Sequence, residues 1–159
     1  MSKLSDHFWL EDFVPKGVWL KWGDNSIWFI DYRMTVFAEK FRVVVGRPVL
    51  INTWKDGGSL NGRGYRNTLI PEYRPESQHS FGRAIDLSCG DMSSFEMVDV
   101  LKKYRDQWPW ITAYESPVDT MIKDKDGKPT AYWLHADCRP LHAQVLNSAF
   151  DLFEVKPVK

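Results

Sequence analysis

The sequence predicts an α+β fold, with a small, mostly antiparallel sheet flanked by helices. Apolar residues recur at helical spacing in two segments, whereas three shorter segments alternate apolar and polar side chains like half-buried strands. The helical segments are residues 26–45 and the residues after Asp91; the strand segments are residues 81–89, 111–115 and 131–138. The length of 159 residues predicts a single domain over residues 1–159.

The composition supports a core and argues against several kinds of partner. Hydrophobic residues make up 43% of the chain, and eight residues are Trp, so a core can form without disulfides. The 21 basic residues are balanced by 21 acidic ones, so we expect no nucleic-acid partner. No apolar run is long enough to span a bilayer, so we expect no membrane insertion. The chain has no coiled-coil pattern, and we expect a monomer.

The first helix is predicted over residues 26–45. Its apolar stripe consists of Ile30, Met34, Phe37, Phe41 and Val44. Gly46 is suited to end the helix, and Pro48 prevents its continuation. Residues 48–54 (PVLINTW) are then predicted to form a short strand.

Residues 55–77 show neither helical nor strand periodicity and are rich in Gly, Asn, Arg and Pro. Because so long a connection is unusual in a compact domain, we expect this loop to have a functional role.

The second half of the chain contains a helix and a predicted hairpin. Ser93 and Glu96 form the pattern of a capping box, so the helix begins there, and Pro109 ends it. The strands 111–115 and 131–138 are predicted to pair around the turn sequence DKDGK. Residues 141–153 (LHAQVLNSAFDLF) are predicted to form a C-terminal amphipathic helix.

Strand alternation predicts which side chains share a face of the sheet. His135 and Asp137 point the same way along one strand, and Asp86 lies on the polar face of another. The opposite faces carry Ile85, Leu87, Cys89, Leu134 and Cys138. We therefore expect both cysteines to be reduced and buried, which argues against a zinc site built from cysteines.

His79, Asp86 and His135 form a candidate metal set. Two imidazoles and one carboxylate are the ligands of many catalytic zinc sites that keep a fourth position open. Spacing alone also allows an alternative, in which His79 is an ordinary loop residue and His135 a hydrogen-bonded strand residue. His7 and His142 have no comparable set of possible ligands near them in the sequence. We expect each to lie on a helix surface or to pack against other side chains.

Two segments resemble the zinc D-Ala-D-Ala carboxypeptidase and murein endopeptidase family, which is related to VanX-type dipeptidases and the hedgehog N-domain. SQHSFGRAIDL (77–87) resembles the family signature S-x-H-x-x-G-x-A-x-D, and WLHADCR (133–139) resembles its W-x-H-x-D strand. LSDHFWLEDFV and VGRPVLINTW resemble further family segments, and INTWKDGGSLNGRGYR resembles phage-encoded members. The resemblance covers most of residues 4–140.

The resemblance implies that His79, Asp86 and His135 bind zinc. It also implies that Ser77 contacts substrate and that an arginine of the long loop, Arg66 or Arg63, holds a substrate carbonyl or carboxylate. The RGYR context favours Arg66.

The chain departs from the family at the general base. Many relatives have Glu, Asp or His two or three residues before the final ligand, where this chain has Trp133 and Tyr132. Glu115 resembles a Glu that ends the preceding strand in other members, and it is the first candidate. Asp137 is the second, although metal sites often use such a carboxylate for orientation, and we expect it to orient a ligand or Arg139.

These features predict a zinc-dependent peptidase that cleaves peptidoglycan stem peptides, of the endolysin or D,D-carboxypeptidase type. The alternative is a non-catalytic zinc-containing module that binds the cell wall or belongs to a phage virion. The N-terminal MSKLSDHFWLEDF lacks the apolar region of a signal peptide. We therefore expect synthesis in the cytoplasm, a phage origin, and release by a holin or incorporation into the virion.

Overall fold

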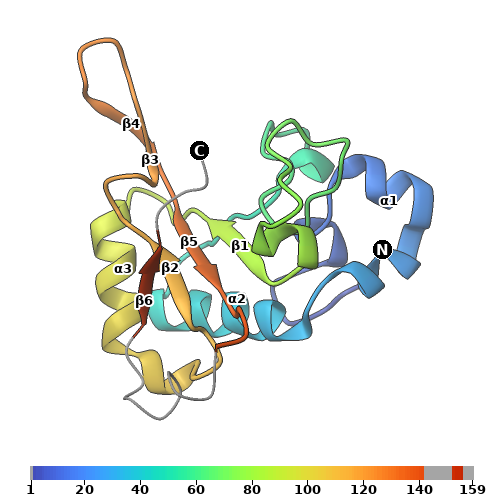
Figure 1. Cartoon of the computed structure of the whole chain (residues 1–159), viewed down its shortest axis with the longest axis horizontal. Helices are drawn as coiled ribbons and strands as arrows, with labels where there is room; N and C mark the ends of the chain where they lie inside the picture. The colour runs from blue at the N-terminus through green and yellow to red at the C-terminus, as the bar shows by residue number, and fades with distance from the viewer. Residues whose placement is uncertain (1, 142–151, 156–159) are drawn as a thin grey trace.

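A four-stranded sheet lies at the centre of the computed structural model, which describes residues 2–141 and 152–155. In order across the sheet, its strands are β1 (Ala84–Leu87), β5 (Leu134–Asp137), β2 (Ala113–Glu115) and β6 (Phe153–Val155). β5 runs antiparallel to both β1 and β2, whereas β6 is parallel to β2 (Figure 1). The predicted α+β fold with a mostly antiparallel sheet is therefore confirmed, and β6 is its parallel exception.

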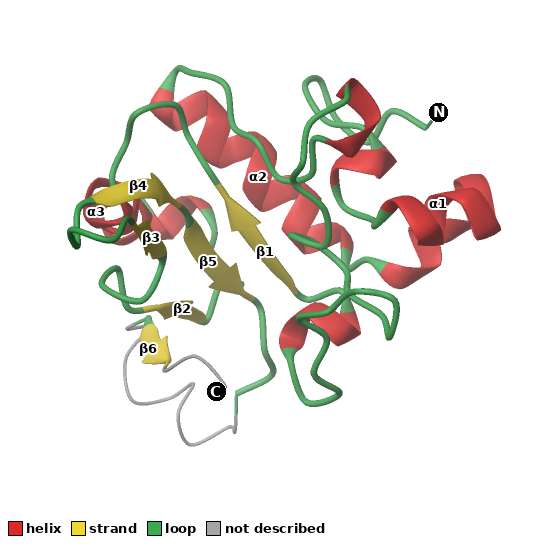
Figure 2. Ribbon diagram, turned by 90° about the horizontal axis from the view of Figure 1, so that it is seen from above, coloured by secondary structure: helices red, strands yellow, loops and turns green. Residues whose placement is uncertain are grey.

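Two helices pack against the sheet. α2 (Tyr32–Val45) lies along β1, and α3 (Ser94–Lys103) contacts β5 (Figure 2). The main core between helices and sheet includes Met34, Phe37, Phe41, Met97, Leu101, Ile85, Leu87, Leu134 and Ala136. The alternate residues Asp86 and His135 point away from this core, as strand alternation predicts.

A second group of elements lies on the opposite side of the molecule from α3 (Figure 1). It contains the short helices η1 (Leu10–Asp12), α1 (Lys16–Trp22) and η2 (Gly23–Phe29). A smaller core of Leu10, Val14 and Val18 holds these elements together. Of the helices in the described residues, none combines the length and the hydropathy that a membrane span requires.

The predicted helix over residues 26–45 begins later than expected, at Tyr32. Asp31 has an extended backbone, and its side chain accepts a hydrogen bond from the Arg33 N–H, so Asp31 is the N-cap. Residues 23–29 belong instead to the 3₁₀ helix η2. Gly46 ends α2 as predicted.

The predicted strand at residues 48–54 is wrong except for a single bridge between Leu50 and Ser88. The polar groups of Asn52 are used to hold other segments. Its side-chain amide donates to the Val14 carbonyl, and its side-chain oxygen accepts from the Arg63 N–H. The long loop that follows contains one short helix, η3 (Trp54–Asp56), before η4 (Gln78–Phe81).

β2 and β5 pair antiparallel as predicted, but the DKDGK turn does not join them. It joins β3 (Met121–Lys123) to β4 (Pro129–Tyr132), which form a separate two-stranded hairpin that projects from the body (Figure 1). The chain leaves this hairpin at Trp133, whose backbone N–H donates to the Thr120 carbonyl, and then enters β5.

The remaining predictions for the second half are confirmed in part. Ser93 and Glu96 form the predicted capping box of α3, but the helix ends at Lys103 and is followed by η5 (Arg105–Gln107). Both cysteines are free and buried, as expected. Of the predicted C-terminal helix, residues 142–151 lie outside the described residues, and Phe153 belongs to β6.

We predict that Gly82→Ala destabilises the fold more than Gly127→Ala does. Both glycines have a positive φ, of 67° and 79°, so both substitutions cost roughly 1–2 kcal/mol in backbone conformation. A Cβ at Gly82 would lie 1.9 Å from the Phe29 carbonyl oxygen, whereas a Cβ at Gly127 meets nothing within 4 Å. Urea unfolding of both variants measures the difference. Equal losses of unfolding free energy would contradict the close approach at Gly82.

Candidate metal centre

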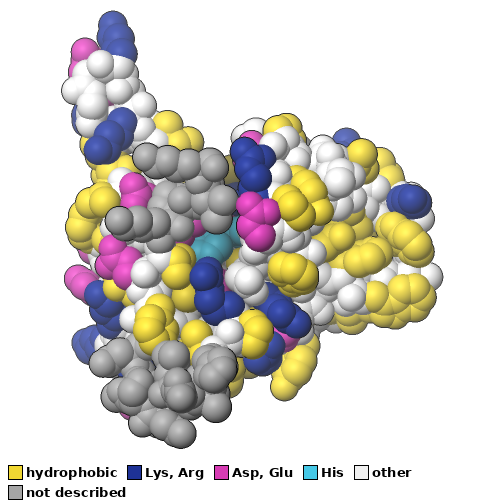
Figure 3. Space-filling view, viewed as in Figure 1, with side chains coloured by type: hydrophobic (Ala, Val, Ile, Leu, Met, Phe, Trp, Pro, Cys, Tyr) yellow, Lys and Arg dark blue, Asp and Glu magenta, His cyan; other side chains and the backbone are white. Residues whose placement is uncertain are grey.

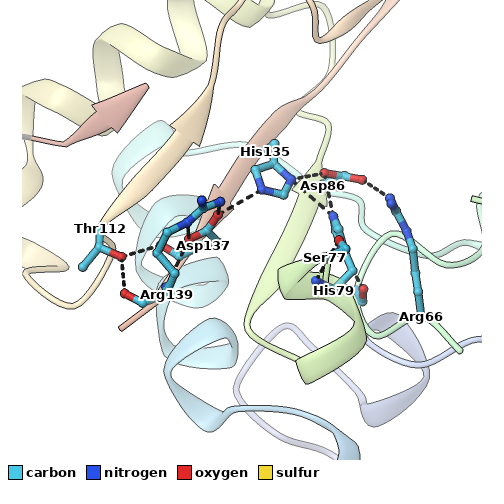
Figure 4. A network of polar contacts seen from close by, with 9 residues as sticks. Arg66, Ser77, His79, Asp86, Thr112, His135, Asp137 and Arg139 are labelled. Atoms are coloured by element: carbon cyan, nitrogen blue, oxygen red, sulfur yellow. Dashed lines mark hydrogen bonds and ion pairs between the residues drawn. The ribbon is translucent and has the colours of Figure 1, made fainter. Parts of the chain in front are cut away.

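Three side chains from different elements converge at one point above the sheet. His79 lies in η4, Asp86 in β1 and His135 in β5. The register of β1 and β5 places Asp86 directly opposite His135. η4 brings His79 beside them, and all three residues are at most 7% exposed. Together they form a group that could hold a metal ion (Figure 4).

The distances between the three ligand atoms suit a tetrahedral ion. Asp86 Oδ1 lies 2.8 Å from His135 Nδ1 and 3.3 Å from His79 Nε2, and the two nitrogens are 3.2 Å apart. An ion with bonds of about 2.0–2.1 Å holds neighbouring tetrahedral ligands about 3.3 Å apart. The three atoms therefore already form nearly one face of such a tetrahedron.

Hydrogen bonds on the far side of each ring turn the ligand nitrogens inward. The Gly64 carbonyl lies 2.7 Å from His79 Nδ1 and can only accept, so Nδ1 carries the proton and Nε2 the lone pair. Asp137 Oδ2 lies 3.3 Å from His135 Nε2, which leaves Nδ1 for the metal. Acceptors behind ligating histidines are usual in metal sites.

The electrostatics of the group favour a positive charge at His135. Burial favours the neutral form of His79 and lowers its pKa. Burial acts against ionisation of Asp86, but the positive charge and the hydrogen bonds that the neighbouring imidazoles can supply outweigh it and hold the pKa of Asp86 well below its usual range. Burial likewise opposes a charged His135, but Asp137 and Asp86 outweigh it and raise its pKa to about 10. A bound cation would replace that proton, as metal binding to histidine generally does.

The long loop holds two of the ligands in place. The Asp86 backbone N–H donates to the Arg63 carbonyl at 2.7 Å, and the Arg66 N–H donates to the His79 carbonyl at 3.0 Å. Arg66 Nη2 also donates to Asp86 Oδ2 at 2.5 Å. Gly64 lies between these contacts, where a Cβ would be 2.2 Å from the Phe13 carbonyl oxygen. Because residue 64 has no side chain, the loop can pack against the Phe13 backbone while the Gly64 carbonyl lies beside His79.

The three ligands open into a cavity of about 490 Å³. In Figure 3 the cyan of histidine is visible at the centre of this face, between the two groups of elements. On the loop side the cavity is lined by Arg66 and Ser77. On the sheet side it is lined by Glu115 at the end of β2, by Trp133 just before β5, and by Arg139 just after β5. A substrate in this cavity would therefore meet charged groups of both signs beside the metal site.

The structure separates the predicted substrate-binding residues. Ser77 caps η4, where its hydroxyl accepts from the His79 N–H, and it lines the cavity. Arg66 also lines the cavity, but Arg63 is not among the lining residues. The Arg63 guanidinium donates to Ser88 Oγ at 2.8 Å and stacks on the Trp133 ring. This placement favours Arg66 over Arg63 as the arginine that meets substrate.

The two candidate bases occupy different positions. Glu115 lines the cavity at the end of β2, and burial raises the pKa of its carboxyl. Asp137 is fully buried and is not among the lining residues. Its carboxylate lies between His135 and Arg139, where it can orient the imidazole. The geometry therefore favours Glu115 for proton transfer and Asp137 for orientation.

Two contributors to the site were not predicted from the sequence: Gly64, and Trp133 as a wall of the cavity. The sequence offered a ligand or Arg139 as the partner of Asp137, and Asp137 contacts both His135 and Arg139. The glycine at position 64 is compatible with close backbone approach, but the sequence does not show that its carbonyl accepts from His79. His7 pairs with Glu39 on the surface, and His142 lies outside the described residues.

We predict that a divalent metal ion stabilises the protein and that His79→Ala abolishes this effect. A ligand that binds only the folded state adds about 2.7 kcal/mol at about 100 times its Kd. Thermal unfolding of each protein with zinc ions and with a chelator measures how far the metal raises the unfolding temperature. Because the comparison is made within one protein, any loss of stability caused by the substitution itself cancels. The same shift in both proteins would contradict the proposed ligand set.

We also predict that Asp137→Asn weakens metal binding by about 10–100-fold. With its amide nitrogen at the position of Oδ2, the new side chain would present a donor to His135 Nε2–H, and the imidazole would then carry its proton on Nδ1, the ligand atom. Competition with a coloured chelator measures the affinity. Asp126→Asn, at an exposed carboxylate of the β3–β4 hairpin, is the control. Equal affinities in the two variants would show that Asp137 does not orient His135.

Comparison with protein-family models, with curated protein sequences and with solved structures finds no match for this chain. Its function is therefore inferred from the geometry of the site and from the motifs in its own sequence.

Proposed function

We propose that the protein is a zinc-dependent peptidase that cleaves peptidoglycan stem peptides. The observation that carries the proposal is the convergence of His79, Asp86 and His135 at a cavity that also contains Glu115. The order of these residues along the chain, and the motifs around them, resemble the zinc carboxypeptidase and murein endopeptidase family. That resemblance supports the choice of peptidoglycan as the substrate.

Zinc suits the donor set. Two imidazole nitrogens and one carboxylate oxygen are typical ligands of catalytic zinc, and three protein ligands leave a fourth position for water or substrate. Oxygen-rich sites would favour magnesium or calcium instead. When bound, zinc would supply a Lewis acid that polarises a carbonyl and lowers the pKa of water.

Glu115 is the proposed general base. Its carboxylate lines the cavity, and it is close enough to His135 and Asp86 for their charges to influence its pKa. Because burial raises that pKa, an Oε atom of Glu115 is a better proton acceptor than an exposed carboxylate. It would take a proton from the attacking water and pass it to the nitrogen of the leaving amine.

Arg66 is the proposed substrate-orienting residue. Its Nη2 holds Asp86 and its Nε donates to the Gly62 carbonyl, so the guanidinium is fixed in position beside the metal site. Its remaining N–H groups can donate to a carbonyl or carboxylate of a peptide in the cavity. The volume of about 490 Å³ is in the range of small-molecule and short-peptide sites.

We predict that the zinc-loaded protein releases new amino groups from purified cell walls and that Glu115→Gln lowers kcat/KM by about 100- to 10,000-fold. The amide cannot accept the proton, but no metal ligand changes, so the zinc content should stay that of wild type. Mass spectrometry of products from a defined muropeptide identifies the bond that is cut. Asp106→Asn, on the exposed surface after α3, is the matched control.

Two outcomes would change this proposal. If Glu115→Gln remains active and Asp137→Asn with restored zinc is inactive, Asp137 is the base. If wild-type protein holds zinc and binds murein but releases no amino groups from any murein, the non-catalytic cell-wall or virion module is the better description.

A further inference from the structure

We infer that Arg139 is a positioning residue of the metal centre: it fixes the carboxylate of Asp137 so that His135 presents Nδ1 to the metal. The inference rests on the metal site that the proposed function uses, but it does not depend on peptidase activity. Arg139 lies four residues after the last ligand and on the opposite side of the ligand set from Arg66 (Figure 4).

Arg139 holds both oxygens of the Asp137 carboxylate. Its backbone N–H and its Nε donate to Oδ1 at 3.1 and 2.8 Å, and its Nη2 donates to Oδ2 at 2.5 Å. Because both oxygens are bound, the carboxylate cannot rotate freely. Oδ2 therefore stays 3.3 Å from His135 Nε2.

The burial of Asp137 makes this contact necessary. Asp137 is 0% exposed, so water cannot stabilise its charge, and a buried carboxylate without a positive partner is strongly destabilising. Arg139 supplies that partner and reaches it from the cavity wall, where its side chain is 32% exposed. Lysine could supply the charge but not the planar pair of donors.

The backbone around Arg139 is anchored as well. Thr112, just before β2, donates from its N–H to the Asp137 carbonyl at 2.9 Å and from its Oγ1 to the Arg139 carbonyl at 2.8 Å. The position of the guanidinium therefore depends on β2 and β5 together. A chain of contacts runs from Thr112 through Arg139 and Asp137 to the ligand His135.

The chain contains a matched control for this arrangement. Arg33 binds Asp31, two residues earlier, in the same pattern, with distances of 3.0, 2.9 and 2.6 Å. That pair caps α2 and includes no metal ligand. Arg33→Lys and Arg139→Lys thus remove the same kind of contact, and only the second one is next to His135.

The experiment measures the affinity of each full-length variant for zinc alone, by competition with a coloured chelator, and the absorption spectrum of the cobalt-loaded protein. We expect Arg139→Lys to weaken zinc binding by about 10-fold or more and to alter the cobalt spectrum. Arg33→Lys should leave both unchanged. In a double-mutant cycle, Arg139→Lys should add little to Asp137→Asn, because both would act on the same imidazole.

A second pair of variants keeps the test decisive if Arg139→Lys folds poorly. Thr112→Val should weaken zinc binding, as Arg139→Lys does. Thr112→Ser keeps the hydroxyl and should bind zinc as tightly as the wild type. Unchanged affinity in Arg139→Lys, or strictly additive effects in the cycle, would overturn the inference. The inference would also be overturned if Arg139→Lys raised only the KM for peptide and left zinc affinity unchanged, since Arg139 would then contact substrate. An inactive but zinc-binding wild type would overturn the peptidase proposal alone.

Discussion

The antiparallel pairing of β1 with β5 is the constraint on which the rest of the site depends. Its register sets Asp86 opposite His135, and strand alternation sends Ile85 and Leu134 to the other face. A slip of one residue would bury the polar side chains in the core and expose the apolar ones. The hydrophobic core therefore specifies the positions of two of the three residues that could hold a metal ion.

The third ligand depends on backbone contacts rather than on the sheet. His79 is held by the carbonyl of Gly64, and the surrounding loop also binds Asp86 through Arg66. Three backbone groups of this long loop, those of Arg63, Gly64 and Arg66, find their partners in Asp86 and His79, so the loop and the site hold each other in place. Substitutions that move this loop should affect the metal site without altering any ligand.

Strand alternation and the two motifs predicted the general fold, the three residues that form a group able to hold a metal ion, and the burial of both cysteines. Patterns of side chains are enough for such features because each face of a strand has one environment. The strand expected at residues 48–54 did not form, because Asn52 uses its side chain to tie two distant segments together. The hydrogen bond from His79 to the Gly64 carbonyl was not predictable either, since every residue has a carbonyl and only the close packing at this position requires glycine. The extra hairpin of β3 and β4 was missed because its apolar side chains, such as the exposed Ile122, face solvent rather than a core.

The separation of the ligands along the chain has a consequence for how the protein folds. His135 is 49 residues from Asp86 and 56 residues from His79, so the loops that join them must close before the three atoms can meet. Contacts between residues this distant in sequence generally form slowly. During synthesis the three side chains therefore cannot meet until the β5 segment has left the ribosome.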